Sequence, residues 1–411
     1  MQDKDLYARL LGLVSPWVVD HVELALQRGE VIVRVKHDDR EPLTCPECNT
    51  PCPGYDVRSR RWRHLDTCQY KTILDADVPR VNCPTHLVKQ VRVPWAEPGS
   101  RFTALFEAVA IDWLKVASAS AVAKQLGISW DEIDHIQEKA VERGQSRRKR
   151  TYPKVIGVDE TSFRKRHDYV TVISDQGSST VLDVQNDRKK ESLDAFFKAL
   201  TPGQLKRIRF VAIDMSQPYM QSIAANLEDG EKKIAFDKFH VAKMLGDAVD
   251  KTRRTENRDL IAVGDRSLVG TKYLWLTRNQ APDPDQDPFE FRGFVSGMLR
   301  TARAWAMKET AMHLWSFESL HAAKRAWKRW LTWASRSRIP DMVKASRTVR
   351  THLRGILTAV VNKITNALGE SINAKIQRIK ARACGYRNKE RFRNAILFHF
   401  GGLDLYPAGI K

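Results

Sequence analysis

The pattern of apolar and polar positions changes its period several times along the chain. Between 151 and 241, short apolar runs bounded by turn residues predict strands, and amphipathic stretches predict helices. The expected strands lie at 155–159, 168–174, 179–185, 208–214 and 232–236, and the expected helices at about 190–200 and 216–227. The segment thus begins with three meandering strands and continues as helix, strand, helix and strand.

Two of these strands end on carboxylates. The run "KVIGVDE" stops at Asp159 and Glu160, and "RFVAID" stops at Asp214. The element order is that of the ribonuclease H-like fold, in which the first and fourth strands are parallel neighbours. Their carboxyl ends then lie roughly 5 Å apart, which places Asp159 beside Asp214.

Two adjacent carboxylates repel each other unless cations lie between them. Mg²⁺ prefers oxygen ligands and keeps water positions open, and two such ions about 4 Å apart can serve phosphoryl transfer. A single aspartate at a strand end is more simply a turn residue or a helix cap. The matched pair, Asp159 and Asp214, favours a site for two magnesium ions.

Residues 1–100 are rich in Pro, Cys and strand-like runs such as "GEVIVRVKH", so we expect a β-rich domain there. Five of the six cysteines lie in this segment. "CPEC" offers Cys45 and Cys48, and "CPTH" offers Cys83 and His86, two knuckles whose donors suit one tetrahedral zinc ion. The competing ligands are Cys52 and Cys68.

From 101 to 150 the pattern is helical and interrupted by Gly127, which permits a tight turn. Ser129 can cap the following helix, with Glu132 completing a capping box. This is the outline of a helix-turn-helix, although an ordinary helical hairpin has the same pattern. On the second helix, His135 and Lys139 are the cationic candidates for base contacts.

The stretch 242–360 is helical and rich in Trp, and we expect an all-α insertion in which most Trp side chains are core. In the last segment, 361–411, apolar residues recur on one face of a helix. A separate polar stripe consists of Asn366, Glu370, Asn373 and Gln377. If this helix packs on the sheet, it brings Glu370 to the two aspartates; otherwise Glu370 is a surface residue.

Charge changes the picture next. The chain has 69 Lys and Arg against 49 Asp and Glu, a formal charge of +20, and nucleic acid is the commonest polyanionic partner. The basic run Arg147, Arg148, Lys149 and Arg150 is expected to lie along phosphates, unless it is simply solvated. No apolar run reaches the length of about 20 residues that a membrane span needs, and we expect a cytoplasmic, nucleoid-associated protein.

Several stretches together resemble the ISL-three family of bacterial insertion-sequence DDE transposases. They include "VIGVDETSFRKRHDYVTVISD", "VAIDMSQPY", "AFDKFHVAKML", "ALGESINAKIQRIKARACGYRN" and the knuckle "CPEC". The resemblance implies that Asp159, Asp214 and Glu370 form the metal-binding triad, and that His240 lies near the scissile phosphate. It also implies an amino-terminal half that binds transposon ends. The second knuckle departs from the family at His86, where Cys is usual.

We therefore expect a multidomain α+β protein: a zinc-binding β domain, a helix-turn-helix, and a ribonuclease H-like α/β catalytic domain with a long all-α insertion. The expected activity is cleavage of double-stranded DNA at inverted-repeat ends and transfer of 3′-hydroxyls to target DNA, by a homodimer or larger assembly. The rivals are a ribonuclease H-like structure-selective nuclease and a zinc-finger regulator with an inactive catalytic domain. Should Glu370 fail, Glu318 and Glu390 are the next acids.

Overall fold

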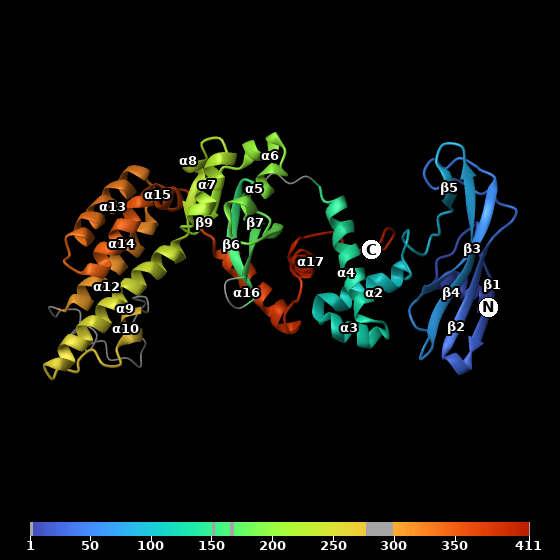
Figure 1. The fold of residues 1–411 in the computed structure, drawn as a ribbon, viewed down its shortest axis with the longest axis horizontal. Coiled ribbons are helices and arrows are strands. Elements are labelled where there is room, and N and C mark those ends of the chain that lie inside the picture. The colour runs from blue at the N-terminus through green and yellow to red at the C-terminus, as the bar shows by residue number, and fades with distance from the viewer. Residues whose placement is uncertain (1–2, 150–152, 165–167, 277–298, 411) are drawn as a thin grey trace. The chain divides into compact units, whose positions relative to one another are not determined.

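The computed structural model describes residues 3–149, 153–164, 168–276 and 299–410. The chain forms two compact units (Figure 1). Unit 1 comprises Met1–Lys149, Arg382–Gly385 and Gly402–Lys411, and unit 2 comprises Arg150–Ala381 and Tyr386–Gly401. Within the described residues, no helix has the length and apolar character that crossing a membrane requires.

Unit 1 begins with a helix, which was not predicted, and continues with the expected β-sheet. The elements are α1 (Asp3–Leu10), β1 (Trp17–Ala25), β2 (Glu30–His37), β3 (Gly54–Arg63), β4 (Lys71–Cys83) and β5 (Leu87–Gln90). Their order is β1-β2-β4-β3, with β5 on β4. Along β4 alternate side chains such as Leu74, Ala76 and Val78 are buried, because successive strand residues face opposite sides. Trp95 packs edge-on against both Trp17 and Trp62.

The helical part of unit 1 contains α2 (Ala104–Val116), α3 (Ala119–Leu126) and α4 (Trp130–Arg147). Gly127 ends α3 with φ 63°, a left-handed conformation that glycine adopts without a steric penalty. Ser129 caps α4, and Glu132 completes the capping box. The predicted turn and cap are therefore confirmed.

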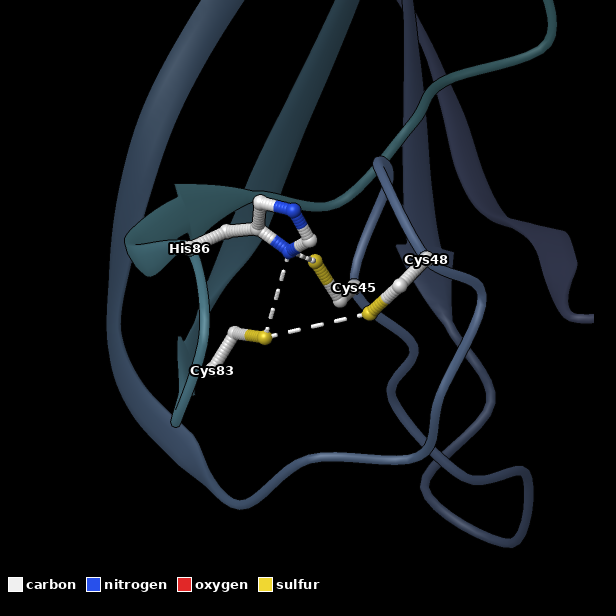
Figure 2. Close-up of side chains that lie close together, drawn as sticks. All are labelled: Cys45, Cys48, Cys83 and His86. Carbon is white, nitrogen blue, oxygen red and sulfur yellow. Dashed lines mark hydrogen bonds between the residues drawn. The ribbon is translucent and has the colours of Figure 1, made fainter.

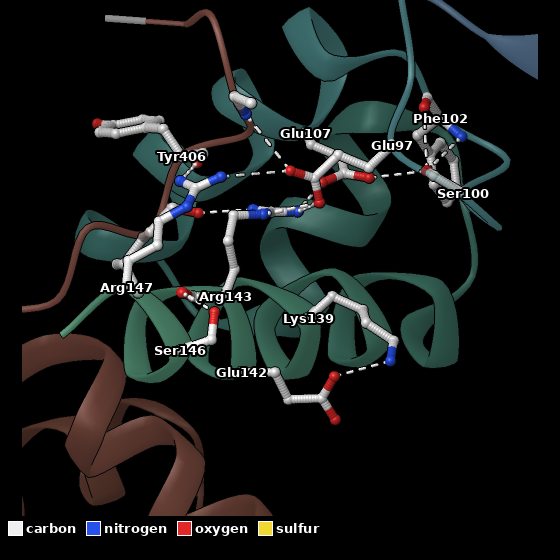
Figure 3. Close-up of polar contacts among 12 residues, drawn as sticks. Glu97, Ser100, Phe102, Glu107, Lys139, Glu142, Arg143, Ser146, Arg147 and Tyr406 are labelled. Atoms are coloured by element: carbon white, nitrogen blue, oxygen red, sulfur yellow. Dashed lines mark hydrogen bonds and ion pairs between the residues drawn. The ribbon is translucent and has the colours of Figure 1, made fainter. Parts of the chain in front are cut away.

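The end of the chain packs on α4 within unit 1 (Figure 3). Arg143 is buried and pairs with Glu97 and Glu107 at 2.6 and 2.7 Å, while its Nη1 donates to Leu405 O at 2.6 Å. Arg147 donates to Tyr406 O at 2.6 Å. These contacts tie the last ten residues, predicted to close the catalytic domain, to the helical part of unit 1.

Unit 2 contains the mixed sheet expected for a ribonuclease H-like domain. Its strands are β6 (Val155–Arg164), β7 (Asp168–Asp175), β8 (Thr180–Asn186), β9 (Phe210–Ile213) and β10 (Ile234–Phe236), in the order β10-β9-β6-β7-β8. The pairs β10–β9 and β9–β6 are parallel, and β6–β7 and β7–β8 are antiparallel. The connecting helices are α5 (Lys190–Lys198), α6 (Pro202–Arg207), α7 (Gln217–Asn226) and α8 (Gly230–Lys233).

A helical region follows, also as predicted. It comprises α9 (Lys238–Ala262), α10 (Lys272–Leu276), α12 (Arg300–His313), α13 (Leu320–Ser335), α14 (Pro340–Thr351) and α15 (Leu353–Asn362). Part of the expected insertion, 277–298, lies outside the described residues. Trp305, Trp327 and Trp330 are core residues, whereas Trp333 is 41% exposed. The chain ends with α16 (Ala367–Arg382) and α17 (Lys389–Phe400).

Candidate active site and zinc centre

The register of the parallel strands aligns three aspartates. Gly157 on β6 pairs with Ala212 on β9, so two residues further along Asp159 comes opposite Asp214. Phe236 on β10 pairs with Ile213 on β9, so the next residue, Asp237, also comes opposite Asp214. Neighbouring strands lie roughly 4.8 Å apart, so the three acids lie side by side at the edge of the sheet where β9 and β10 end. The strand predicted to stop at Asp159 does not stop there, because β6 stays paired with β7 as far as Arg164.

Acidic side chains dominate the electrostatics of this edge. Burial raises the pKa of Asp159 to about 6, and the charges of Asp214 and Asp237 act in the same direction. Burial also raises the pKa of Asp214. One oxygen of each side chain accepts a backbone hydrogen bond, at 2.8 Å from Glu160 N to Asp159 and at 3.1 Å from Ser216 N to Asp214.

Helix α16 brings Glu370 toward this edge, because its polar stripe faces β6. Successive carbonyl groups of a strand point to opposite sides, so every second carbonyl of β6 points toward β9. Lys154 O is one of these, and it accepts a hydrogen bond from Phe210 N. The same edge continues past the end of β9 to the carbonyls of Glu160 and Ser162, which β9 cannot reach. The α16 side chains occupy this edge instead.

The contacts along that edge are specific. Asn373 Nδ2 donates to Glu160 O at 3.1 Å, and Lys380 Nζ donates to Ser162 O at 2.7 Å. Gln377 Nε2 donates to Thr161 Oγ1 at 2.8 Å. Two members of the predicted stripe, together with Lys380, thus satisfy strand groups that would otherwise lack partners, and they fix the register of α16 against β6.

Two glycines, one on β6 and one on α16, leave room for the side chain of Asn366 between them. A Cβ atom on Gly157 would lie 2.7 Å from Asn366 Oδ1, and one on Gly369 would lie 2.6 Å from the same atom. Buried Asn366 also donates its backbone N–H to Asp237 Oδ1 at 3.1 Å. The start of α16 is therefore held directly against the acidic edge.

Glu370 has the features of a carboxylate that can bind a divalent cation. Burial raises its pKa, and the charge of Asp237 adds to this effect. Its Oε1 is buried without a hydrogen-bond partner among the described residues. Carboxylates with raised pKa values and an orphaned oxygen fit divalent cations such as Mg²⁺, which take oxygen ligands.

Asp237 is the residue that sequence reasoning missed. It is 2% exposed, and its Oδ2 lies 3.4 Å from Nδ1 of His240, one turn later on α9. Asp237 raises the pKa of His240, so the imidazole favours its cationic form beside the acids. The signal was available, since "KKIAFD" is a third apolar run that ends on an aspartate.

The two alternative acids, Glu318 and Glu390, lie away from this acidic edge in different surroundings. Glu318 is exposed and pairs with Lys363 at 2.7 Å. Glu390 is in the first turn of α17 and pairs with Arg393. Neither has the burial or the acidic neighbours of Glu370.

The two knuckles of unit 1 come together as one ligand cluster (Figure 2). The donor atoms of Cys45, Cys48, Cys83 and His86 all lie within 4.8 Å of one another. The Cys48–Cys83 sulfurs are 3.8 Å apart, and His86 Nδ1 is 3.6 Å from Cys83 Sγ. With Zn–S near 2.3 Å and Zn–N near 2.0–2.1 Å, the edges of a tetrahedral site are about 3.8 and 3.6 Å.

The competing cysteines do not join this cluster. Cys52 Sγ donates instead to Thr50 O at 3.3 Å, and Cys68 is exposed. Hydrogen bonds from Thr50 lower the pKa of Cys48 to about 6, toward the thiolate that binds metal. Four protein ligands leave no open position, so this is a structural zinc ribbon site.

The residues expected to contact DNA differ in the partners that they have within the protein. On α4, His135 lies 3.7 Å from Glu138. Lys139 pairs with Glu142 at 2.7 Å (Figure 3). Arg147 is engaged by the chain end, as described above. Arg148 and Lys149 follow α4, and Arg150 lies outside the described residues.

Comparisons with known proteins agree along the chain. Residues 156–396 match the DDE model of family ISL3, described as "Transposase". Residues 91–141 match the helix-turn-helix domain of transposase family ISL3, and 41–86 match the zinc-finger of transposase IS204/IS1001/IS1096/IS1165.

Two curated relatives extend this likeness over nearly the whole chain. The transposase for insertion sequence element IS1557 of Mycobacterium tuberculosis is 28% identical, over 95% of this chain and 94% of its own length. The transposase for IS1001 of Bordetella parapertussis is 26% identical, over 98% and 99%. Because the transposase model covers more than half of the sequence, the chain belongs to the ISL3 family of DDE transposases, enzymes that catalyse DNA cleavage and strand transfer.

Proposed function

We propose that this transposase binds the terminal inverted repeats of an insertion sequence, cuts the DNA there and joins the freed 3′-hydroxyls to target DNA. The observation that carries the proposal is the convergence of Asp159, Asp214 and Glu370 at the carboxyl edge of parallel strands. Three half-buried acids with raised pKa values side by side favour a working site over a structural remnant of one.

Asp159, Asp214 and Glu370 would hold two Mg²⁺ ions, which supply activation of the attacking oxygen and stabilisation of the leaving oxygen. The chain's own residues position the rest. Asp237 orients His240 and favours its cation, which would contact the scissile phosphate. The α16 stripe holds Glu370 at the height of the two aspartates.

Unit 1 supplies DNA binding through its helix-turn-helix. We propose that α4, capped by Ser129, enters a major groove and that His135 and Lys139 exchange their acidic partners on the helix for base edges. Arg148, Lys149 and Arg150 would follow the phosphates, joined by Arg147 if it leaves the chain end. Because two ends must be joined together, a homodimer or larger assembly is expected on DNA.

The deciding experiment incubates the protein and Mg²⁺ with labelled duplex carrying the inverted repeats and with a supercoiled target plasmid. We expect nicks at the repeat boundary and labelled ends joined to the plasmid. Cuts at DNA junctions without joining would instead identify a structure-selective nuclease. Specific binding without any cut would identify a regulator with an inactive catalytic domain.

A further inference from the structure

Helix α13 carries a surface that the catalytic reaction does not use. Its buried stripe consists of Ala323, Trp327, Trp330, Leu331 and Ala334. On the opposite side, Lys324, Arg325, Lys328 and Arg329 are all exposed. We call these four residues the α13 cationic face. They form two rows, each with a spacing of four residues, or about 6 Å along the helix.

The charge of this face is not balanced locally. The α13 sequence, LHAAKRAWKRWLTWAS, contains no Asp or Glu, and in the described part of the chain none of the four cations has an ion pair. Helix α9 of the same unit differs, because there Asp250 pairs with Arg253 and Arg254 at 2.9 and 3.1 Å. Such pairs stabilise a solvated helix, and without them the four α13 charges are available to an external anion.

A second feature marks the face as an interface. Trp333 follows Arg329 by one turn and is 41% exposed, whereas Trp327 and Trp330 on the same helix are core. Tryptophan and arginine are both enriched at interfaces, and here they lie next to each other on an exposed surface.

We propose that the α13 cationic face binds the phosphate backbone of target DNA. The face offers closely spaced positive charges, which suit the phosphates that every duplex presents regardless of its sequence. It belongs to the unit that carries the acids, whereas the helix-turn-helix belongs to the other unit. The inference rests on the proposed function, in which unit 1 binds the element's ends and the catalytic unit needs its own contact with the second duplex.

The test separates the two DNA substrates in strand transfer. The double variant Lys328→Ala/Arg329→Ala keeps good helix formers and removes two charges. Its control, Lys251→Ala/Arg258→Ala, removes two exposed charges from α9. Each protein is assayed for end cleavage, and for joining of pre-cut ends to random-sequence plasmid at increasing plasmid concentration, in 50 and 200 mM salt.

We expect the α13 variant to need about tenfold more target for half-maximal joining at 50 mM salt, with an unchanged maximal rate. The deficit should largely vanish at 200 mM, since two lost phosphate contacts lower the salt slope by about 1.8. End cleavage should equal that of the wild type, and the control should behave as the wild type in both assays.

Three results would overturn the inference. If end cleavage falls in parallel with joining, the face holds the element's end. If the target requirement is unchanged, the face is solvated, and if the control shifts equally, only net charge matters. A wild type that neither cuts nor joins contradicts the proposed function itself, and binding of random duplex by the three proteins then still tests the face.

Discussion

The two ligand centres of this transposase are built on opposite principles. In unit 1, Cys45, Cys48, Cys83 and His86 come from two short turns, and their donor atoms already have the spacings of a tetrahedral zinc site. In unit 2, the acids come from the middle of β6, the end of β9 and a helix that lie far apart in the sequence, and burial raises their pKa values.

The difference teaches what each centre is for. A closed set of four soft ligands stabilises the fold around one ion and leaves no position for a substrate. Crowded carboxylates with an orphaned oxygen destabilise the protein by themselves and leave room for cations, water and phosphate. The following predictions test this contrast.

The largest effect is expected at the zinc centre. Cys48→Ser should release the zinc and unfold the surrounding part of unit 1, because structural zinc contributes roughly 10 kcal/mol or more to such folds. Metal analysis and thermal unfolding would measure this. Cys52→Ser and Cys68→Ser are the matched controls and should keep one zinc per chain; loss of zinc from either would show that the ligand set is wrong.

The next effect concerns the acids. Asp159→Ala, Asp214→Ala or Glu370→Gln should each lower cleavage by about 10³-fold or more, which corresponds to roughly 4 kcal/mol in the transition state. Binding of end DNA should stay nearly unchanged, because unit 1 supplies it. The measurement pairs a cleavage assay with a binding titration. Normal cleavage by Glu370→Gln would shift attention to Glu390 and Glu318.

A smaller effect tests unit 1 away from its metal. Burial lowers the pKa of His64 to about 4, and its Nδ1 lies 2.9 Å from Thr103 Oγ1, which caps α2. In the unfolded chain His64 takes up a proton near its ordinary pKa of 6.5, whereas in the folded protein it stays neutral there. Its contribution to the free energy of unfolding is therefore complete above pH 6.5. As the pH falls toward 4 it is lost, up to roughly 3 kcal/mol.

Denaturant unfolding of the wild type and of His64→Gln between pH 4 and 7 measures this contribution. The difference between the two curves isolates His64, because loss of zinc in acid is common to both proteins. Parallel curves across the whole range would contradict the assignment.

The smallest effect concerns the register of α16. Asn373→Leu removes the hydrogen bond to Glu160 O and should lower the cleavage rate about tenfold, or roughly 1.4 kcal/mol, while more Mg²⁺ becomes necessary for half-maximal activity. Lys375→Leu, on the exposed side of the same helix, is the control. If both variants fall equally, or if the Mg²⁺ requirement does not move, Asn373 has only a structural role.

Local signals account for what could be predicted. The x-x spacing of the knuckles, the Gly127 turn with its Ser129 cap, and the apolar strand runs that precede Asp159 and Asp214 each depend on neighbouring residues, and the structure contains all of them. The polar stripe of α16 was recognisable from its helical spacing in the sequence, but the strand groups that it contacts were not. Asp237 was overlooked because one more acid after a short apolar run resembles an ordinary helix cap.

The sequence by itself determined which residue types recur at helix and strand spacing, and therefore the zinc ligands, the helix-turn-helix and the order of the catalytic strands. Only the tertiary structure decided what depends on distant contacts. Strand register places Asp237 beside Asp214. Because β9 ends before β6 does, the uncovered edge of β6 provides the carbonyl and hydroxyl partners of Asn373 and Gln377. The physical reason is that periodicity fixes which face a side chain occupies, whereas the neighbour across that face is set by how whole elements pack.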